Sequence, residues 1–407
     1  MISSPSWFDE SLRTAMQTHR SATRDEQAYF VYQLDRLKAH LAHLQKQQVV
    51  KLWFAVKANP LSKILHTLDS EGFCFDVASS GELAQVVAQG ISPNRILNTG
   101  PAKSKKQLSA FLAQGVTTFV VESLNQLKWL NEAAEEQKIK PQVLLRVQLQ
   151  WPEGDKNPLG GNSLTPFGLS VQEWQGVHVE QYPALDLCGL HIFQWGNMLS
   201  NEKMYSLWTQ MVAPLTSLAN DIGMTLKVLD LGGGLGIDYL QQGNTLSWDK
   251  IIDDLATIKH QAGVEELWLE LGRYAVAECG YYVVPVVDRK TNYEQEQLVL
   301  AAGINHLLRP AITEQPFPVM LLRESQHQEK HFDIHGPLCT SMDKLGHLTL
   351  PDDVKVGDQL VFGLCGAYGF TESMPFFLCH ETAAEYVFEN EEMTEVRAAK
   401  SADWYLV

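Results

Sequence analysis

The stretch LWFAVKANP, from Leu52 to Pro60, places a lysine directly after an apolar run. An apolar run of this length predicts a buried strand. A lysine at the buried end of a strand must pair its charge, leave it unpaired or lower its pKa. A lysine that gives up its proton easily can form a Schiff base, so Lys57 is a candidate catalytic residue. By itself the stretch fits an ordinary lysine past a strand better, so the choice depends on the rest of the chain.

Around this stretch, short apolar runs alternate with helical stretches such as Leu124–Gln137 and Asn201–Ile222, which is typical of βα units on a parallel sheet. Eight such units over about 240 residues predict an α/β fold, a TIM-type (β/α)8 barrel. The alternative is an open, doubly wound sheet, which would normally have fewer strands and an early Gly-rich turn. The eight runs are Leu52–Val56, Phe73–Val77, Arg95–Leu97, Thr118–Val121, Gln142–Val147, Leu187–Ile192, Leu226–Leu231 and Leu267–Leu271.

The chain changes character after the eighth run. Residues 281–365 contain β-rich runs, such as Tyr281–Val287 and Gln359–Phe362, with turn signals and little helix. This pattern predicts a C-terminal antiparallel β domain, with a polar turn over Lys290–Glu296. We expect two domains, a barrel over residues 28–280 and a β domain formed by residues 1–27 and 281–407.

Composition disfavours several classes of protein. The chain has 407 residues and a formal net charge of −16 without a basic stripe, so we expect no nucleic-acid or membrane partner. The first residues lack the basic flank and apolar core of a signal peptide, and no run is long enough to span a bilayer. Six scattered cysteines without CxxC spacing predict reduced thiols rather than disulfides or a zinc site. We therefore expect a cytoplasmic enzyme without a metal.

In a TIM barrel, functional residues lie at the C-terminal ends of the strands. In this chain, those ends carry an amine, carboxylates, an imidazole, a guanidinium and a glycine loop of the size that binds phosphate. Each signal is weak alone, and together they indicate one site. The candidates are Lys57, Asp76, Asn98, Glu122, Arg146, His191, Gly232, Gly233, Gly234, Glu270, Gly272 and Arg273.

The glycine loop lies in LDLGGGLGI, from Leu229 to Ile237. Glycines let backbone N–H groups approach an anion without Cβ clashes, and a phosphate site after strands seven and eight recurs in barrels. A tight turn without a ligand is the alternative. In the next motif, ELGR, Arg273 can hold phosphate through two hydrogen bonds and Glu270 can pair with a protonated ring nitrogen. A structural ion pair is the alternative there.

Three further residues have both a chemical and a structural interpretation. His191, in CGLHIFQW, fits a satisfied core histidine or a ring stacked on a flat cofactor. Cys339, in GPLCTSMD, fits a proton donor or a small buried residue. Tyr368, in CGAYGFTES, fits a phosphate contact or a core aromatic. An imine-forming lysine, a phosphate loop and a carboxylate for a ring nitrogen together describe pyridoxal 5'-phosphate.

These motifs resemble those of the fold-type III pyridoxal-phosphate decarboxylases, close to the diaminopimelate and ornithine decarboxylase family. The resemblance covers nearly the whole chain and implies an alanine racemase-like fold, decarboxylation of an amino-acid α-carboxylate, and a head-to-tail homodimer with shared active sites. It implies that Lys57 forms the Schiff base, that His191 stacks on the cofactor ring and that Glu270 holds the pyridine nitrogen. It also implies that Cys339 transfers a proton from the partner subunit and that Tyr368 approaches the phosphate. The motifs are AVKANP, FDVASSGEL with Asp76, GGGLG, ELGR, AAGINHLLRP, GPLCTSMD and GAY.

Departures from the family pattern bear on the substrate. Thr340 follows the cysteine where meso-diaminopimelate enzymes carry a glutamate for the distal amino group, and Ala301 stands where an acidic residue is expected. Without these carboxylates a basic distal amine lacks partners, so diaminopimelate, ornithine and lysine are disfavoured. The pattern looks most like decarboxylases of carboxylate siderophore pathways, whose substrates are citryl-conjugated amino acids such as citryl-diaminopropionate or O-citryl-serine. We expect this carboxylate-rich substrate to contact Arg146, Arg309, Thr340 and Asp343.

Two more departures concern the residues after His191 and after the RPA segment. Phe193, Gln194 and Trp195 replace the family's Gly-Ser pair after His191, and the usual tyrosine is missing after the RPA segment. The insert Trp151–Leu164 is expected above the barrel mouth. The alternatives are a decarboxylase of diaminopimelate or of another free or carrier-bound amino acid, an amino-acid racemase of the same fold, and a non-catalytic cofactor-binding protein. A racemase would need a second base and would release no carbon dioxide.

Overall fold

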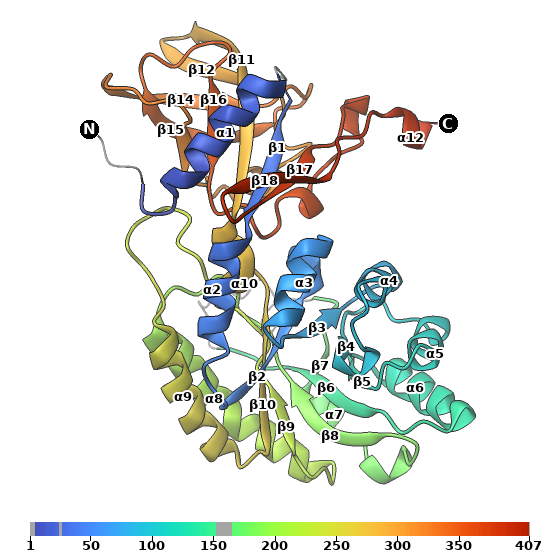
Figure 1. The fold of residues 1–407 in the computed structure, drawn as a ribbon. Coiled ribbons are helices and arrows are strands. Elements are labelled where there is room, and N and C mark those ends of the chain that lie inside the picture. Colours follow the sequence, from blue (N-terminus) through green and yellow to red (C-terminus); the bar gives the residue numbers. More distant parts are fainter. Residues whose placement is uncertain (1–4, 24–26, 152–164, 407) are drawn as a thin grey trace. The chain divides into compact units, whose positions relative to one another are not determined.

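The computed structural model describes residues 5–23, 27–151 and 165–406, so the insert after Trp151 lies outside the described residues. The chain divides into two compact units (Figure 1). The barrel unit contains Leu41–Ile237 and Asn244–Tyr274, and the β unit contains Met1–His40, Asp238–Gly243 and Ala275–Val407. The domain boundaries expected at residues 28 and 280 remain a prediction.

Eight parallel strands close into the predicted barrel. The pairing of β5 with β6, with Val121 opposite Leu145, completes the circle, and this closure excludes the open doubly wound sheet. A short strand, β7 (Leu169–Ser170), pairs with the end of β6. The barrel strands are β2 (Val50–Ala55), β3 (Cys74–Val77), β4 (Ile96–Asn98), β5 (Thr118–Val121), β6 (Gln142–Gln148), β8 (Asp186–His191), β9 (Val228–Asp230) and β10 (Glu266–Leu271).

Serine caps explain where the barrel helices begin. The hydroxyls of Ser79, Ser104, Ser123, Ser200 and Ser247 each accept the backbone N–H three residues later, which satisfies an amide that the first helical turn leaves unpaired. Figure 1 shows these helices around the outside of the barrel strands. The barrel helices are α3 (Ser62–Ser70), α4 (Ser80–Ala88), α5 (Lys105–Ala113), α6 (Leu124–Gln137), α7 (Val171–Trp174), α8 (Asn201–Asp221) and α9 (Trp248–Ala262).

The inside of the barrel changes from apolar to polar along the strands. One buried residue from each strand forms an apolar cluster: Trp53, Cys74, Leu97, Val120, Leu144, Cys188, Val228 and Trp268. Side chains alternate between the two faces of a strand, so residues two positions further on share the inward direction. A register shift brings His191 opposite both Arg146 and Asp230. The resulting polar ring at the C-terminal end of the strands contains Asp76, Thr99, Glu122, Arg146, His191, Asp230 and Glu270.

The β unit contains the predicted sheet, which is mostly antiparallel. Two parallel pairs, β1 with β17 and β12 with β14, were not predicted. The polar turn predicted over Lys290–Glu296 is too long, because the hairpin strands leave only Tyr293 and Glu294 between them. The strands are β1 (Tyr29–Gln33), β11 (Gly280–Asn292), β12 (Gln295–Leu300), β13 (Val319–Leu321), β14 (Glu329–His335), β15 (Lys344–Pro351), β16 (Gln359–Phe362), β17 (Ala384–Glu389) and β18 (Glu392–Arg397).

The remaining helices lie before β2 or after β10. None of the described helices is long and apolar enough to cross a membrane. All six cysteines are free thiols, as predicted. The helices are α1 (Glu10–Thr23), α2 (Leu34–Leu44), α10 (Arg273–Val276), α11 (Arg309–Thr313) and α12 (Asp403–Leu406).

Candidate active site

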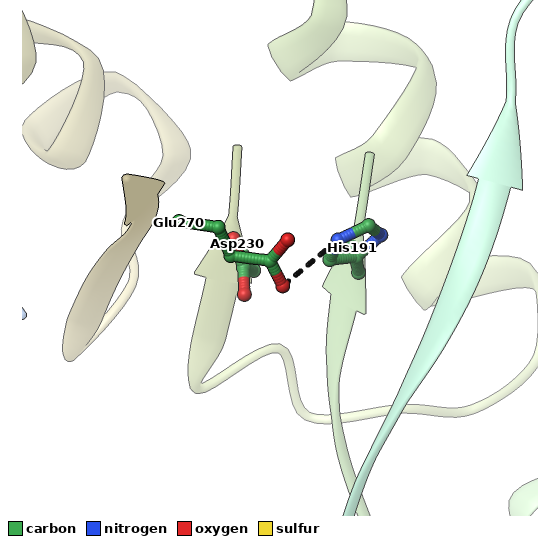
Figure 2. Close-up of side chains that lie close together, drawn as sticks. All are labelled: His191, Asp230 and Glu270. Atoms are coloured by element: carbon green, nitrogen blue, oxygen red, sulfur yellow. Dashed lines mark ion pairs between the residues drawn. The ribbon is translucent and has the colours of Figure 1, made fainter. Parts of the chain in front are cut away.

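Three residues of the polar ring lie together on adjacent strands (Figure 2). His191 ends β8, Asp230 ends β9 and Glu270 lies near the end of β10. Nε2 of His191 lies 3.3 Å from Oε1 of Glu270, and one ligand atom from each residue lies within 4.8 Å of the others. The sequence analysis included His191 and Glu270 but not Asp230. Alternation from the buried Val228 could have identified Asp230 as an inward residue.

Several polar atoms of this cluster are buried without a hydrogen-bond partner among the described residues. They are both ring nitrogens of His191, Oδ2 of Asp230 and Oε1 of Glu270. The contact between His191 and Glu270 is therefore an ion pair by distance rather than a well-directed hydrogen bond. Leaving a buried polar atom unsatisfied costs about 1–3 kcal/mol, so the cluster fits a ligand that supplies partners. By distance alone that ligand could be a metal ion or an organic cofactor.

Burial and nearby charges set the ionisation of the two carboxylates. Burial, together with the charge of Glu270, raises the pKa of Asp230 well above its usual value. Burial also acts to raise the pKa of Glu270, but His191, Lys57 and Arg146 outweigh burial and lower it. Glu270 is therefore ionised at neutral pH. Its negative charge suits a positively charged partner, such as a protonated ring nitrogen, better than it suits another carboxylate.

Lys57 lies in the turn η1 (Val56–Ala58), directly after β2. Its side chain is exposed, so the expectation of a lysine at a buried strand end is wrong, because the strand stops at Ala55. The ammonium still acts on the site. Burial, followed by the charge of Glu270, raises the pKa of Asp76 to about 8, and the charge of Lys57 opposes this rise. Asp76 also accepts a hydrogen bond of 2.5 Å from the hydroxyl of Thr99.

The glycine loop after β9 packs against the loop after β8. A Cβ atom at Gly232 would lie 2.6 Å from Cβ of Phe193, and one at Gly234 would lie 2.5 Å from the carbonyl oxygen of Trp195. The N–H of Gly232 donates to Asp230 at 2.8 Å. Among the described residues, the N–H groups of Gly233 and Gly234 have no partner. The loop therefore needs glycine for packing, and its two available amides fit an anion such as phosphate.

Gln194, one of the residues that depart from the family pattern, fixes the loop after β8. Gln194 is buried, and its side-chain amide accepts the N–H of Leu149 at 3.0 Å and donates to the carbonyl of Leu149 at 2.9 Å. These two hydrogen bonds join the loops after β6 and β8. Gln194 thus supports the wall on which the glycine loop packs, a role that the sequence did not suggest.

A second buried cluster joins β5, β6 and the loop after β4. Oε1 of Glu122 lies 3.7 Å from Nζ of Lys103 and 3.4 Å from Nη1 of Arg146. Oε2 of Glu122 accepts the N–H of Gly168 at 3.1 Å. The sequence analysis missed Lys103, which looks like one of several lysines in a polar loop. Glu122 and Arg146 lie in the ring as predicted from their strand ends.

Asn98 and the two candidates after β10 are not part of the polar ring. Asn98 is buried and donates to the carbonyl of Val77 at 3.0 Å, and alternation turns it away from the barrel interior. Its neighbour Thr99 lies in the polar ring at the strand end where we expected Asn98. Gly272 and Arg273 follow β10 directly, and Arg273 begins α10.

The remaining candidates lie in the β unit. Cys339 is exposed and Thr340 is half-buried. Asp343 is buried, and its two oxygens accept the N–H groups of Ile304 at 2.8 Å and Leu338 at 2.7 Å. These bonds favour a structural role for Asp343, holding the turn that carries Cys339, over the predicted substrate contact.

Arg309 and Tyr368 are neighbours in the β unit. Nη1 of Arg309 pairs with Glu372 at 2.5 Å, and its guanidinium lies 4.7 Å from the centre of the Tyr368 ring. Tyr368 has a φ of 54°, which is uncommon for a residue other than glycine. Their predicted contacts with substrate and phosphate remain predictions.

The comparisons with known proteins decide which ligand the barrel binds. The family model described as "Pyridoxal-dependent decarboxylase, pyridoxal binding domain" matches residues 34–277. The chain belongs to the pyridoxal-dependent decarboxylases. The decarboxylase is 29% identical over 369 residues to 2-[(L-alanin-3-ylcarbamoyl)methyl]-2-hydroxybutanedioate decarboxylase of Staphylococcus aureus, with coverage of 86% of this chain and 92% of the relative.

Two diaminopimelate decarboxylases are also similar. The enzyme of Pseudomonas aeruginosa is 30% identical over 355 residues, covering 84% of this chain and 82% of the relative. The structure of the enzyme from Helicobacter pylori complexed with L-lysine matches with a TM-score of 0.84 at 22% identity, covering 95% of this chain and 97% of that chain. This second likeness shows that the decarboxylase has the expected barrel and β-domain fold.

The decarboxylase uses pyridoxal phosphate and is a carboxy-lyase. The site residues fit this cofactor. Glu270 offers an ionised, unsatisfied oxygen to a ring nitrogen, and the amides of Gly233 and Gly234 suit its phosphate. Which residue holds which part of the cofactor remains a prediction.

Proposed function

We propose that the decarboxylase removes the α-carboxylate of an amino acid that is conjugated to a citryl group, as a step of siderophore biosynthesis. The Staphylococcus aureus relative supports this substrate class, since its name describes a hydroxybutanedioate joined through a carbamoylmethyl group to C3 of L-alanine. Such a molecule is a citrate amide of an amino acid, like citryl-diaminopropionate.

The observation that carries the proposal is the lack of carboxylates at Thr340 and Ala301. The hydroxyl of Thr340 accepts the N–H of Met342 at 3.3 Å within its own turn. The backbone N–H of Ala301 donates to the carbonyl of Pro285 at 2.9 Å, and its methyl side chain offers no charge. Neither position can hold a distal ammonium group, so the distal end of the substrate is better matched by neutral or acidic groups.

An acidic substrate also needs a cation. Arg323 pairs with Asp353 and with Asp358, each at 2.8 Å, and is neutralised by them. Arg309 pairs with Glu372. Arg146 instead shares the single carboxylate of Glu122 with Lys103. Of these three arginines, Arg146 therefore keeps the most positive charge for a substrate carboxylate.

The chain's own residues support decarboxylation in the following way. Pyridoxal phosphate, when bound, accepts the electron pair that is left as the carboxylate departs as carbon dioxide. In our proposal Lys57 would hold the cofactor through its amine until the amine of the substrate replaces it. Glu270, whose pKa is lowered, would pair with the ring nitrogen, and His191 would stack on the ring. Cys339, supplied by a second subunit, gives a proton to Cα.

A substrate panel tests the proposal. The purified holoenzyme is incubated with citryl-diaminopropionate, O-citryl-serine, meso-diaminopimelate, ornithine, lysine and glutamate, and released carbon dioxide and product mass are measured. We expect kcat/KM for a citryl conjugate to exceed that for meso-diaminopimelate by about 100-fold or more, because a missing charge partner costs several kcal/mol. Turnover of meso-diaminopimelate at the higher rate would overturn the proposal.

Two alternatives have specific support. Diaminopimelate decarboxylation is favoured by the Pseudomonas aeruginosa relative. A carrier-bound substrate is favoured by L-glutamyl-[BtrI acyl-carrier protein] decarboxylase of Niallia circulans, which is 24% identical over 397 residues, covering 93% of each chain. The same panel separates them if it includes an aminoacyl carrier protein.

A further inference from the structure

The barrel buries two cations against one carboxylate. Lys103 is 3% exposed, Glu122 is 3% exposed and Arg146 is 6% exposed. Burying an ion costs several kcal/mol unless an opposite charge compensates it. One carboxylate can compensate one cation, so the cluster keeps a surplus positive charge. This surplus lies at the functional end of the barrel, because Arg146 is directly opposite His191 in the strand pairing.

Glu122 is held from several sides. Its Oε1 contacts both cations, its Oε2 accepts the N–H of Gly168, and its own N–H donates to Gln126 at 2.8 Å. Lys103 also donates to the carbonyl of Gly100. The carboxylate therefore has little freedom to turn toward either cation alone.

Arg146 is held just as firmly. Its guanidinium contacts Glu122, donates to the carbonyl of Phe193 at 3.4 Å and lies 4.6 Å from the centre of the Phe167 ring. Its charge acts on the ring of carboxylates: it helps to lower the pKa of Glu270, and it opposes, without reversing, the rise in the pKa of Asp230. Arg146 is thus a fixed cation beside the cofactor site.

We propose that Lys103 is a positioning residue: it neutralises Glu122 and so leaves Arg146 its positive charge for an anionic oxygen at the C-terminal end of β6. Without Lys103, the carboxylate of Glu122 would cancel the charge of Arg146. The anionic oxygen belongs either to the cofactor or to the α-carboxylate that every substrate of such a decarboxylase carries. The role of Lys103 is therefore independent of the citryl proposal.

Two binding measurements test this role and distinguish the two sources of the anion. The apoenzyme is titrated with pyridoxal 5'-phosphate. The holoenzyme is titrated with L-serine and with ethanolamine, which lacks the carboxylate. For Lys103→Met we expect a loss of about tenfold or more in the cofactor affinity or in the preference for L-serine over ethanolamine. Lys105→Met is the matched control, because Lys105 is 59% exposed and pairs with Glu132 on the surface.

The double variant Lys103→Met/Glu122→Gln separates a charge effect from a loss of packing. It removes one charge of each sign, so the surplus on Arg146 returns and both binding measurements should return to wild-type values. Packing damage would instead accumulate in the double variant. The proposal would be overturned if Lys103→Met gave wild-type values in both binding measurements, or if the double variant retained the tenfold loss. If Lys103→Met does not fold, Lys103→Gln takes its place in both binding measurements and is judged by the same criterion.

Discussion

At the scale of single residues, Lys57 carries the simplest prediction. Replacing it by alanine removes the amine that we expect to bind the cofactor covalently. Lys57→Ala should lose the visible absorbance of the lysine-bound cofactor, and borohydride reduction should leave no pyridoxyl group on the chain by mass spectrometry. Lys63→Ala, which changes an exposed lysine of α3, should behave like the wild type. A pyridoxyl group that remains on Lys57→Ala would contradict the assignment.

Lys103 carries a prediction about pH. Burial lowers the pKa of Lys103 to about 8, while Glu122 and Asp76 act to raise it and Arg146 to lower it. An unfolded lysine titrates near about 10.4, so between these values the unfolded chain binds more protons and the free energy of unfolding rises with pH. The free energy of unfolding of the wild type, relative to that of Lys103→Met, should therefore rise by on the order of 1–3 kcal/mol from about pH 7.5 to about pH 10. Urea unfolding of both proteins measures this, and a constant difference would refute it.

At the scale of elements, the glycine loop is the most sensitive segment. A Cβ atom at Gly233 would overlap the carbonyl oxygen of Glu270. The loop after β9 must then move, and we expect Gly233→Ala to lower the free energy of unfolding by about 1–3 kcal/mol and to weaken cofactor binding. Gly81→Ala is the control, because Gly81 lies on α4 with its nearest contact at 3.8 Å. Urea unfolding and cofactor titration should separate the two variants, and equal behaviour would count against the packing argument.

At the scale of the whole molecule, the proposed homodimer can be tested by mixing inactive variants. If each active site combines Lys57 of one subunit with Cys339 of the other, Lys57→Ala and Cys339→Ala chains should complement each other. Random pairing makes half of the dimers mixed, each with one complete site, so about a quarter of the wild-type activity should return. Carbon dioxide release before and after refolding the mixture measures this, with each variant refolded alone as the control. No recovery would place the whole site within one chain.

Much of the fold followed from local patterns. The eight barrel runs and helical stretches such as Leu124–Gln137 and Asn201–Ile222 could be predicted, because apolar runs and helical spacing depend on residues close together in the chain. The two parallel strand pairs of the β unit could not, because they join segments far apart in the sequence. The exposure of Lys57 depended on where β2 stops, and strand ends are poorly defined by hydrophobicity.

The amino-acid sequence by itself determined the strand series, the glycine loop, and the lysine and carboxylate at strand ends, since each depends on residues close together in the chain. Only the tertiary structure decided which side chains share the polar ring. The register shift on β8 places His191 between Arg146 and Asp230, and alternation chooses Thr99 over Asn98. The partners of Glu122 come from separate βα units, because buried charges are compensated by whatever the closed barrel brings within a few ångström.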